Sequence, residues 1–146
     1  MSHVKKSALV AYSAADMFAL VDDVARYPEF LPWCGGADVL EQTATLTVAT
    51  VHIDYLGIRQ SFTTENTKVK NSEMNLKLRD GPFERLDGKW RFQELDKSAC
   101  KVSLELDYGF ANPLLEAAVG PVFGIIANTM IERFVARADE LYGDKR

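Results

Sequence analysis

The side chains best suited to acid–base or metal chemistry are few and scattered in this sequence. His3 and His52 are the only histidines, and neither has a cysteine, a carboxylate or a second histidine at metal-ligand spacing. Asp22 and Asp23 are adjacent, and adjacent residues of a helix point about 100° apart, so we interpret them as solvated residues at a helix end. His52 is interpreted as a strand residue. We therefore predict no catalytic residue, no metal site and no other cofactor.

Nucleophile and phosphate-binding motifs are also missing. The sequence has no GxSxG, Walker-type or GxGxxG segment, and nothing in it builds a nucleophile–base pair. The two cysteines, Cys34 and Cys100, form no CxxC pair. Spacing leaves a disulfide between them open, but a reducing cytosol favours two free, buried thiols. The protein is accordingly predicted not to be an enzyme.

Bulky apolar residues beside turns are the stronger functional signal. Three of them lie in the proline-constrained segment 27–33, and Phe83 follows Gly81-Pro82. Large apolar residues in loops commonly line pocket mouths or partner surfaces, although core packing is the alternative for each, and the favoured one for Trp90. The expected ligand contacts are Phe30, Leu31 and Trp33 on one lip of a cavity, Phe83 on the other, Phe123, Ile126 and Met130 on its helical wall, and in addition Trp90.

The elements that must position these residues follow from the hydrophobic pattern. Residues 4–12 read as a strand, and Ser13 caps a short amphipathic helix that runs to Val24. Residues 36–110 read as successive strands separated by turns at Gly57, at 80–82 and at 96–98. A change of phase near residues 49–50 predicts a β-bulge. Clean alternation over 101–110 indicates an antiparallel sheet with one solvated face.

A long C-terminal helix completes the chain. Asn112-Pro113 is a strong helix start, and an apolar stripe at helical spacing continues from Leu114 to Leu141. Gly120-Pro121 must either bend this helix or divide it in two. The fold class is therefore predicted to be α+β, with a curved antiparallel sheet wrapped around the long helix. Such a packing leaves space for apolar pockets between sheet and helix.

Length and charge narrow the class of partner. A chain of 146 residues fits a single domain, 1–146, and its net charge is −4. Residues 56–101 carry ten basic and seven acidic side chains, a local balance of +3 that leaves −7 for the rest. An acidic protein is poorly suited to gripping DNA or RNA phosphates. No signal peptide is visible, and the longest uncharged run has fifteen residues, short of a membrane span, so a cytoplasmic protein is expected.

Three segments resemble a known family. They are YPEFLPWC at 27–34, GPFERLDGKWRF at 81–92 and FANPL at 110–114. They are similar to the coenzyme Q-binding START-like family, the branch of the polyketide cyclase/dehydrase-like superfamily that also contains bacterial ribosome association toxins. The resemblance implies a helix-grip (START-like) fold with a hydrophobic cavity, and it covers the chain to residue 143.

The same resemblance supplies the functional expectations. Mitochondrial members look like ubiquinone chaperones that support respiration, and this chain looks like a bacterial member. The first expectation is a binding protein for a quinone or another isoprenoid lipid, cytoplasmic or peripheral to the inner membrane, with transient contact to the membrane surface. The second is a toxin-like inhibitor of ribosomal subunit association, with the ribosome as partner. A cyclase-like enzyme is the third.

Overall fold

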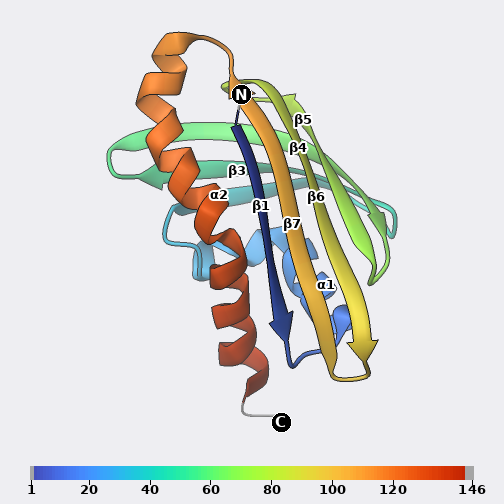
Figure 1. Ribbon diagram of the computed structural model, residues 1–146. Coiled ribbons are helices and arrows are strands. Elements are labelled where there is room, and N and C mark those ends of the chain that lie inside the picture. The colour runs from blue at the N-terminus through green and yellow to red at the C-terminus, as the bar shows by residue number, and fades with distance from the viewer. Residues whose placement is uncertain (1, 144–146) are drawn as a thin grey trace.

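The computed structural model describes residues 2–143, which form one antiparallel sheet, a short helix, a 3-10 helix and a long C-terminal helix (Figure 1). In chain order the elements are β1 (Ser2–Val10), α1 (Ala14–Asp22), η1 (Val24–Glu29), β2 (Cys34–Gln42), β3 (Leu46–Tyr55), β4 (Ile58–Val69), β5 (Glu73–Asp80), β6 (Phe83–Asp96), β7 (Ala99–Phe110) and α2 (Pro113–Tyr142).

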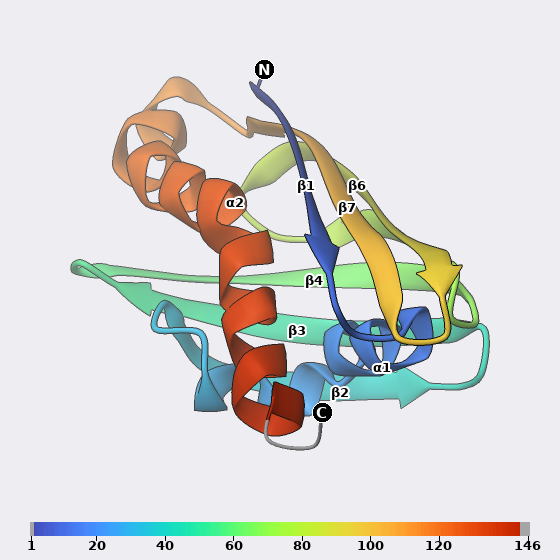
Figure 2. The same ribbon diagram turned by 60° about the horizontal axis from the view of Figure 1, so that its bottom comes forward.

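The seven strands pair in the order β1-β7-β6-β5-β4-β3-β2, and every pair is antiparallel. The sheet curves, and α2 runs along its concave side (Figures 1 and 2). Strand β7 shows the predicted alternation, because its even-numbered residues from Cys100 to Tyr108 are buried and their neighbours face water. The predicted α+β fold, a curved sheet gripping a long helix, is confirmed.

The turn between β3 and β4 follows from two residues with positive φ. Leu56 has a φ of 52° and Gly57 a φ of 82°, while Tyr55 pairs directly with Ile58. Two consecutive left-handed residues make the type I′ turn whose twist matches that of a hairpin. The turn predicted at Gly57 is confirmed.

The predicted bulge lies on the neighbouring strand. The β3–β4 register runs without a shift from Leu46 to Tyr55, whereas β2 carries an extra residue, Leu40, opposite the junction of Val48 and Ala49. The phase change in β3 has another cause: Thr47 is fully buried although it is polar. The prediction of a bulge at 49–50 was therefore wrong, because a buried polar residue mimics a change of parity.

The helix starts were predicted correctly. The Ser13 hydroxyl accepts a hydrogen bond from the Asp16 N–H at 3.0 Å, which caps α1. The Asn112 side chain does the same for α2 by accepting from the Leu115 N–H at 2.9 Å. The proline-containing segment that follows α1 forms the 3-10 helix η1 and not a regular α-helix.

Helix α2 remains one element of 30 residues although Pro121 lies inside it. Figure 2 shows that its N-terminal turns lie at an angle to the rest, so the proline bends the helix without dividing it. Among residues 2–143, α2 is also the one helix long and apolar enough to span a membrane by length and composition, a test that core helices pass as well. The length of the longest uncharged run, which we used to argue against a membrane span, was therefore too strict a criterion.

Two aromatic clusters hold α2 on the concave face. The first surrounds Phe123 with rings from three strands, with centroid distances of 4.7 to 6.4 Å; its members are Phe62, Phe83, Tyr108 and Phe110. The second surrounds the fully buried Phe134 at 5.2 to 5.4 Å, with Tyr27, Phe30 and Trp90. Because edge-to-face contacts dominate both clusters, they fix the helix by geometry as well as by buried area.

One buried ion pair ties α1 to the sheet. Lys68 on β4 places its ammonium 2.9 and 3.1 Å from the two carboxylate oxygens of Asp22, and only 2% of the lysine side chain is exposed. The Thr47 hydroxyl donates to the same carboxylate at 3.0 Å. We had expected Asp22 to be solvated at the helix end, and this was wrong. Its carboxylate faces the sheet, where it binds Lys68 and Thr47.

Replacing Lys68 by methionine should lower the free energy of unfolding by about 3–5 kcal/mol, because it leaves the Asp22 carboxylate buried without its cation. Urea denaturation measures the change. Arg79→Met is the matched control, since its ion pair with Glu65 at 3.2 Å is exposed and should contribute less than about 1 kcal/mol. Equal losses in the two variants would contradict this account.

Candidate functional site

The expected ligand contacts lie mostly inside the core. Leu31 is 1% exposed and Phe83 5%, so neither forms the solvent-exposed lip that we expected of them. Phe83 is the first residue of β6 and stacks on Phe110 at 5.1 Å. The other buried members are Trp33, Trp90, Phe123 and Ile126, while Phe30 and Met130 are half-buried. Their role as ligand contacts stays a prediction.

The structure brings these residues into separate groups. Phe83 and Phe123 meet in one aromatic cluster at 4.8 Å, and Phe30 and Trp90 flank Phe134 in the other. The clusters lie under two different parts of α2. The two expected lips therefore do not face each other across one opening.

An apolar groove of about 380 Å³ runs between the edge strand β1 and the flank of α2. Its lining residues are Lys6, Ser7, Ala8, Asn128, Ile131, Glu132, Val135, Ala136 and Asp139. Ala8 comes from the same face of β1 as the core residues Val4 and Val10, and Ile131 and Val135 lie one turn apart on α2. Sequence reasoning missed this groove, although the strand parity of Ala8 and the four-residue spacing on α2 were visible.

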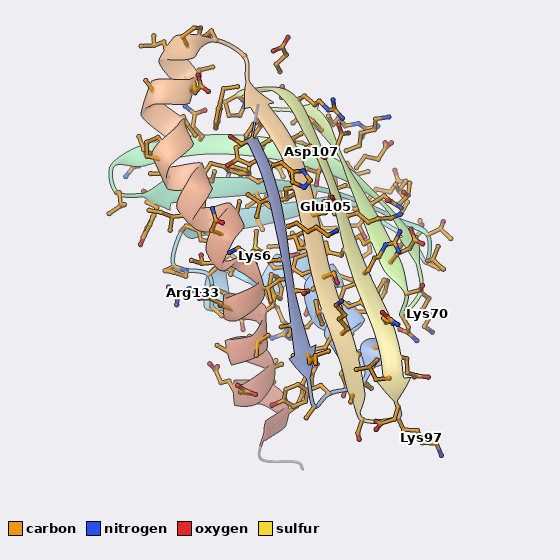
Figure 3. All side chains as sticks on the ribbon, viewed as in Figure 1. Lys6, Lys70, Lys97, Glu105, Asp107 and Arg133 are labelled. Carbon is orange, nitrogen blue, oxygen red and sulfur yellow. The ribbon has the colours of Figure 1, made fainter. Side chains whose placement is uncertain are left out.

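Polar side chains stand at the rim of the groove. Lys6 lies beside α2, and Arg133 lies on the outer side of the helix (Figure 3). Asp139 accepts a hydrogen bond from the Tyr12 hydroxyl. The floor is aliphatic and the rim is charged, which suits a ligand with a long apolar part.

A polar strip runs along the concave face of β4 towards Asp22 at the end of α1. Thr64, Asn66 and Lys68 alternate along β4 with exposed or half-exposed residues, and all three are buried. The contact of Phe62, on the same face of β4, with Phe123 places this face opposite the helix. Within residues 2–143, three buried side-chain polar atoms have no hydrogen-bond partner: Trp33 Nε1, Asn66 Oδ1 and Arg137 Nε.

Arg137 connects α2 to η1. Its guanidinium is 2.7 Å from Glu29 and 2.8 Å from Glu140, and it lies 5.1 Å from the centre of the Phe30 ring. A second hollow of about 290 Å³ adjoins this contact, with Arg26 on its wall. The two carboxylates already neutralise the Arg137 cation, so this hollow is poorly suited to an anion.

The outer face of the sheet carries charges such as Glu105 and Asp107 on β7, and Lys70 and Lys97 lie in the hairpin turns at its end (Figure 3). Several cations of residues 56–101 form ion pairs with neighbouring carboxylates. Arg59 pairs with Asp54, and Arg85 pairs with Asp87. The local excess of +3 is therefore spread over a mixed surface. Among residues 2–143 no group of three or more His, Cys, Asp or Glu side chains could hold a metal ion.

One polar row on that face was not foreseen. His52 lies 2.6 Å from the Ser61 hydroxyl and 2.7 Å from the Asp38 carboxylate, so a serine does lie beside a possible base. Gly36 makes room for the imidazole, because a Cβ there would lie 3.3 Å from its Cδ2 atom. The Asp38 side chain is 67% exposed, and water competes for it. The row ties β2, β3 and β4 together.

Both thiols are free and buried, as predicted. The Cys34 thiol donates to the Gly36 carbonyl at 3.3 Å. Burial raises the pKa of Cys34, and it raises the pKa of Cys100 to about 11. Neither thiol has the lowered pKa that a nucleophilic cysteine needs.

These features define a helix-grip protein with an apolar groove. Comparison with known proteins identifies its family. Residues 10–135 match the family described as polyketide cyclase / dehydrase and lipid transport, and the chain belongs to this family. The resemblance drawn from the three sequence segments is thereby confirmed.

Relatives of full length carry two kinds of name. The chain is 45% identical over 144 residues to the "Ribosome association toxin RatA" of Vibrio cholerae, covering 99% of this chain and 100% of the relative. It is 44% identical over 142 residues to the protein of the same name from Pseudomonas aeruginosa, covering 97% and 99%. The mitochondrial "Coenzyme Q-binding protein coq10" of Schizosaccharomyces pombe is 28% identical over 142 residues, covering 92% and 85%.

Solved structures support the fold. A START superfamily protein from Mycobacterium smegmatis matches with a TM-score of 0.79 at 19% identity, covering 95% of this chain and 98% of that one. The Zhui aromatase/cyclase from Streptomyces sp. R1128 matches with a TM-score of 0.78 at 19% identity, covering 94% and 93%. At such low identity these likenesses establish the architecture alone.

Phe83→Ala should lower the free energy of unfolding by about 3–5 kcal/mol, because it opens a cavity among Tyr108, Phe110 and Phe123. This reverses our expectation for an exposed lip residue. Phe30→Ala, at the half-buried edge of the other cluster, should cost clearly less. Urea unfolding of both variants tests the contrast, and a loss below about 1 kcal/mol for Phe83→Ala would refute it.

Alkylation of Cys100 should be slow at pH 8, where a thiol with a pKa of about 11 is thiolate in only about one molecule per thousand. Its rate in a Cys34→Ser background should rise about tenfold per pH unit up to about pH 11. The unfolded thiol, with a pKa of about 8.5, loses its proton first, so stability should fall between about pH 8.5 and 11. A rate plateau near pH 9 would contradict the raised pKa.

Proposed function

We propose that this protein binds a long, apolar small molecule and catalyses no reaction on it. The observation that carries the proposal is the groove between β1 and α2, whose aliphatic floor adjoins the core and whose rim is polar. Its volume of about 380 Å³ falls within the usual range of about 300–1,000 Å³ for small-molecule sites. The groove lies where the flank of α2 and the edge strand β1 are separated.

The ligand we propose is an isoprenoid quinone or a related lipid. The coq10 relative, whose name states that it binds coenzyme Q, supports this class. Each buried methylene of a long tail contributes about 0.8 kcal/mol, so ten of them supply about 8 kcal/mol before the ordering costs of binding are subtracted. The half-buried Met130 precedes the groove residue Ile131 on α2, and the buried Ile126 lies one turn before Met130, so a tail could extend from the groove along this part of the helix.

The second candidate is inhibition of ribosomal subunit association. The names of the relatives at 44–45% identity favour it, and it would place the protein in the cytoplasm. The charge argues against direct binding to RNA phosphates, since the net charge is −4 and surface cations such as Arg59, Arg79 and Arg85 are paired. Sub-micromolar, stoichiometric blocking of subunit joining in sedimentation would reverse our ranking.

Two weaker proposals remain from the sequence. The exposed Leu114 and Ile125 on α2 offer apolar surface for transient contact with a membrane. A cyclase-like activity rests on structural neighbours that share the architecture alone. Neither explains the groove as directly as a lipid ligand does.

Filling the groove should abolish ligand uptake. Ala8→Phe adds a ring beside Ile131 and Val135 at a half-exposed position, so we expect it to weaken binding of a decyl-substituted benzoquinone at least tenfold with little change in stability. Ala44→Phe, in the exposed β2–β3 turn, is the matched control and should bind normally. Calorimetric titration compares the two, and equal affinities would exclude the groove.

The proposal as a whole is tested by mass spectrometry of organic extracts of the protein purified from its own host. A bound isoprenoid lipid, or saturable uptake of a long-tailed quinone by the purified protein, is the expected result. If both are missing, the proposed function is wrong.

A further inference from the structure

The charged side chains on the rim of the groove differ in whether they have a partner. Three of them line it, Lys6, Glu132 and Asp139. The Asp139 carboxylate accepts a hydrogen bond from the Tyr12 hydroxyl. Within residues 2–143, the side chains of Lys6 and Glu132 form neither an ion pair nor a hydrogen bond. Two charged groups of the rim are therefore free to contact a ligand.

These two side chains belong to opposite walls of the groove. Lys6 lies on β1 between Val4 and Ala8, whose side chains are on the concave side, and Figure 3 shows it beside α2. Glu132 lies on α2, one turn after Asn128 and one turn before Ala136, which also line the groove. The lysine and the glutamate thus border one groove without forming an ion pair with each other. The space between them can hold the polar end of a ligand.

The charges of the rim decide which polar end fits. An ammonium group only donates hydrogen bonds, and a carboxylate only accepts them. One lysine and two carboxylates give the rim a net charge of −1. An anionic head group would raise this to −2, whereas a carbonyl oxygen accepts from Lys6 without adding charge. The rim therefore favours a neutral head group that carries an acceptor.

We propose that Lys6 donates a hydrogen bond to a carbonyl oxygen of the ligand, and that Glu132 and Asp139 exclude ligands with an anionic head group. The class selected is a neutral amphiphile with a carbonyl head, such as a quinone. Fatty acids and prenyl phosphates have the same kind of tail but the wrong charge. This inference rests on the proposed function and narrows the chemistry of its ligand.

The groove has room for a ring and an alkyl chain together. Its α2 wall extends from Asn128 to Asp139, roughly 16 Å at a rise of 1.5 Å per residue. The chain lies on the aliphatic floor beside Ala8, Ile131 and Val135, and the carbonyl lies at the rim. A short-chain aromatic compound is therefore a suitable probe of the head-group contact.

Three probes with the same ring and tail isolate the effect of the head group. 4-Hexylacetophenone has a neutral carbonyl, 4-hexylbenzoate has a carboxylate that is ionised at about pH 7.5, and hexylbenzene has no polar group. In calorimetric titrations the wild-type protein should bind the ketone about three- to tenfold more tightly than hexylbenzene. It should also bind the ketone at least about threefold more tightly than the benzoate.

Substitutions assign these preferences to their residues. Lys6→Met keeps the apolar stem and should reduce the affinity for the ketone to that for hexylbenzene, whereas Lys6→Arg should preserve the preference. Lys5→Met is the matched control, because Lys5 is the adjacent lysine on the opposite face of β1, across from Glu105. All three residues changed here are exposed or replaced by side chains of similar length, so the melting temperature should change little.

The glutamate has its own test. Glu132→Gln removes one negative charge from the rim and should raise the affinity for 4-hexylbenzoate about threefold. Glu116→Gln, at an exposed position in the first turn of the same helix and outside the groove, is the control and should leave that affinity unchanged.

The outcomes separate this inference from the function on which it rests. Equal affinities of the wild-type protein for all three probes would overturn the head-group assignment and leave the apolar site standing. Tightest binding of the benzoate would show that the groove selects an anion, and the inference would be wrong. A ketone preference that survives in Lys6→Met would mean that Lys6 only protects the edge strand β1 from pairing with other chains. If none of the probes binds, the proposed function fails as well.

Discussion

The packing of one helix against the concave face of one sheet is the contact on which the rest of this protein depends. Phe123 and Phe134, eleven positions apart and near opposite ends of the buried stripe of α2, each sit in an aromatic cluster built from distant parts of the chain. Between them the helix is held by aliphatic residues such as Ile126. Removing either ring would loosen α2, and the same contact limits what can enter between helix and sheet.

A polar strip along β4, on the same concave face, sets the protein apart from a simple apolar core. The Lys68–Asp22 ion pair closes one end of the strip and anchors α1, so its charges have a structural purpose. Three other buried polar atoms of the described residues, Asn66 Oδ1, Trp33 Nε1 and Arg137 Nε, have no hydrogen-bond partner. Polar groups without partners cost stability, and proteins retain them where function needs them. The family and the coq10 relative are consistent with a lipid-like occupant of this space.

The sequence predicted correctly those features that depend on interactions between neighbouring residues. The caps at Ser13 and Asn112, the turn at Gly57 and the alternation of β7 each depend on a few neighbouring residues, and all were predicted correctly. Contacts between distant parts of the chain were not predicted. Lys68 binds Asp22, which is 46 positions away in the sequence, and Thr47 is buried because it donates to the same carboxylate. The groove and the His52 row require knowing which strand edges and faces meet, which periodicity does not state.

The central claim is that an apolar molecule lies between α2 and the concave face. Intermolecular nuclear Overhauser effects between a long-tailed quinone and ¹³C-labelled methyl groups test it most directly. We expect contacts from the tail to Ile126, Met130, Ile131 and Val135, and none to methyl groups of the outer face such as Leu9 or Val69. Saturable binding with contacts confined to outer-face methyl groups would contradict the account.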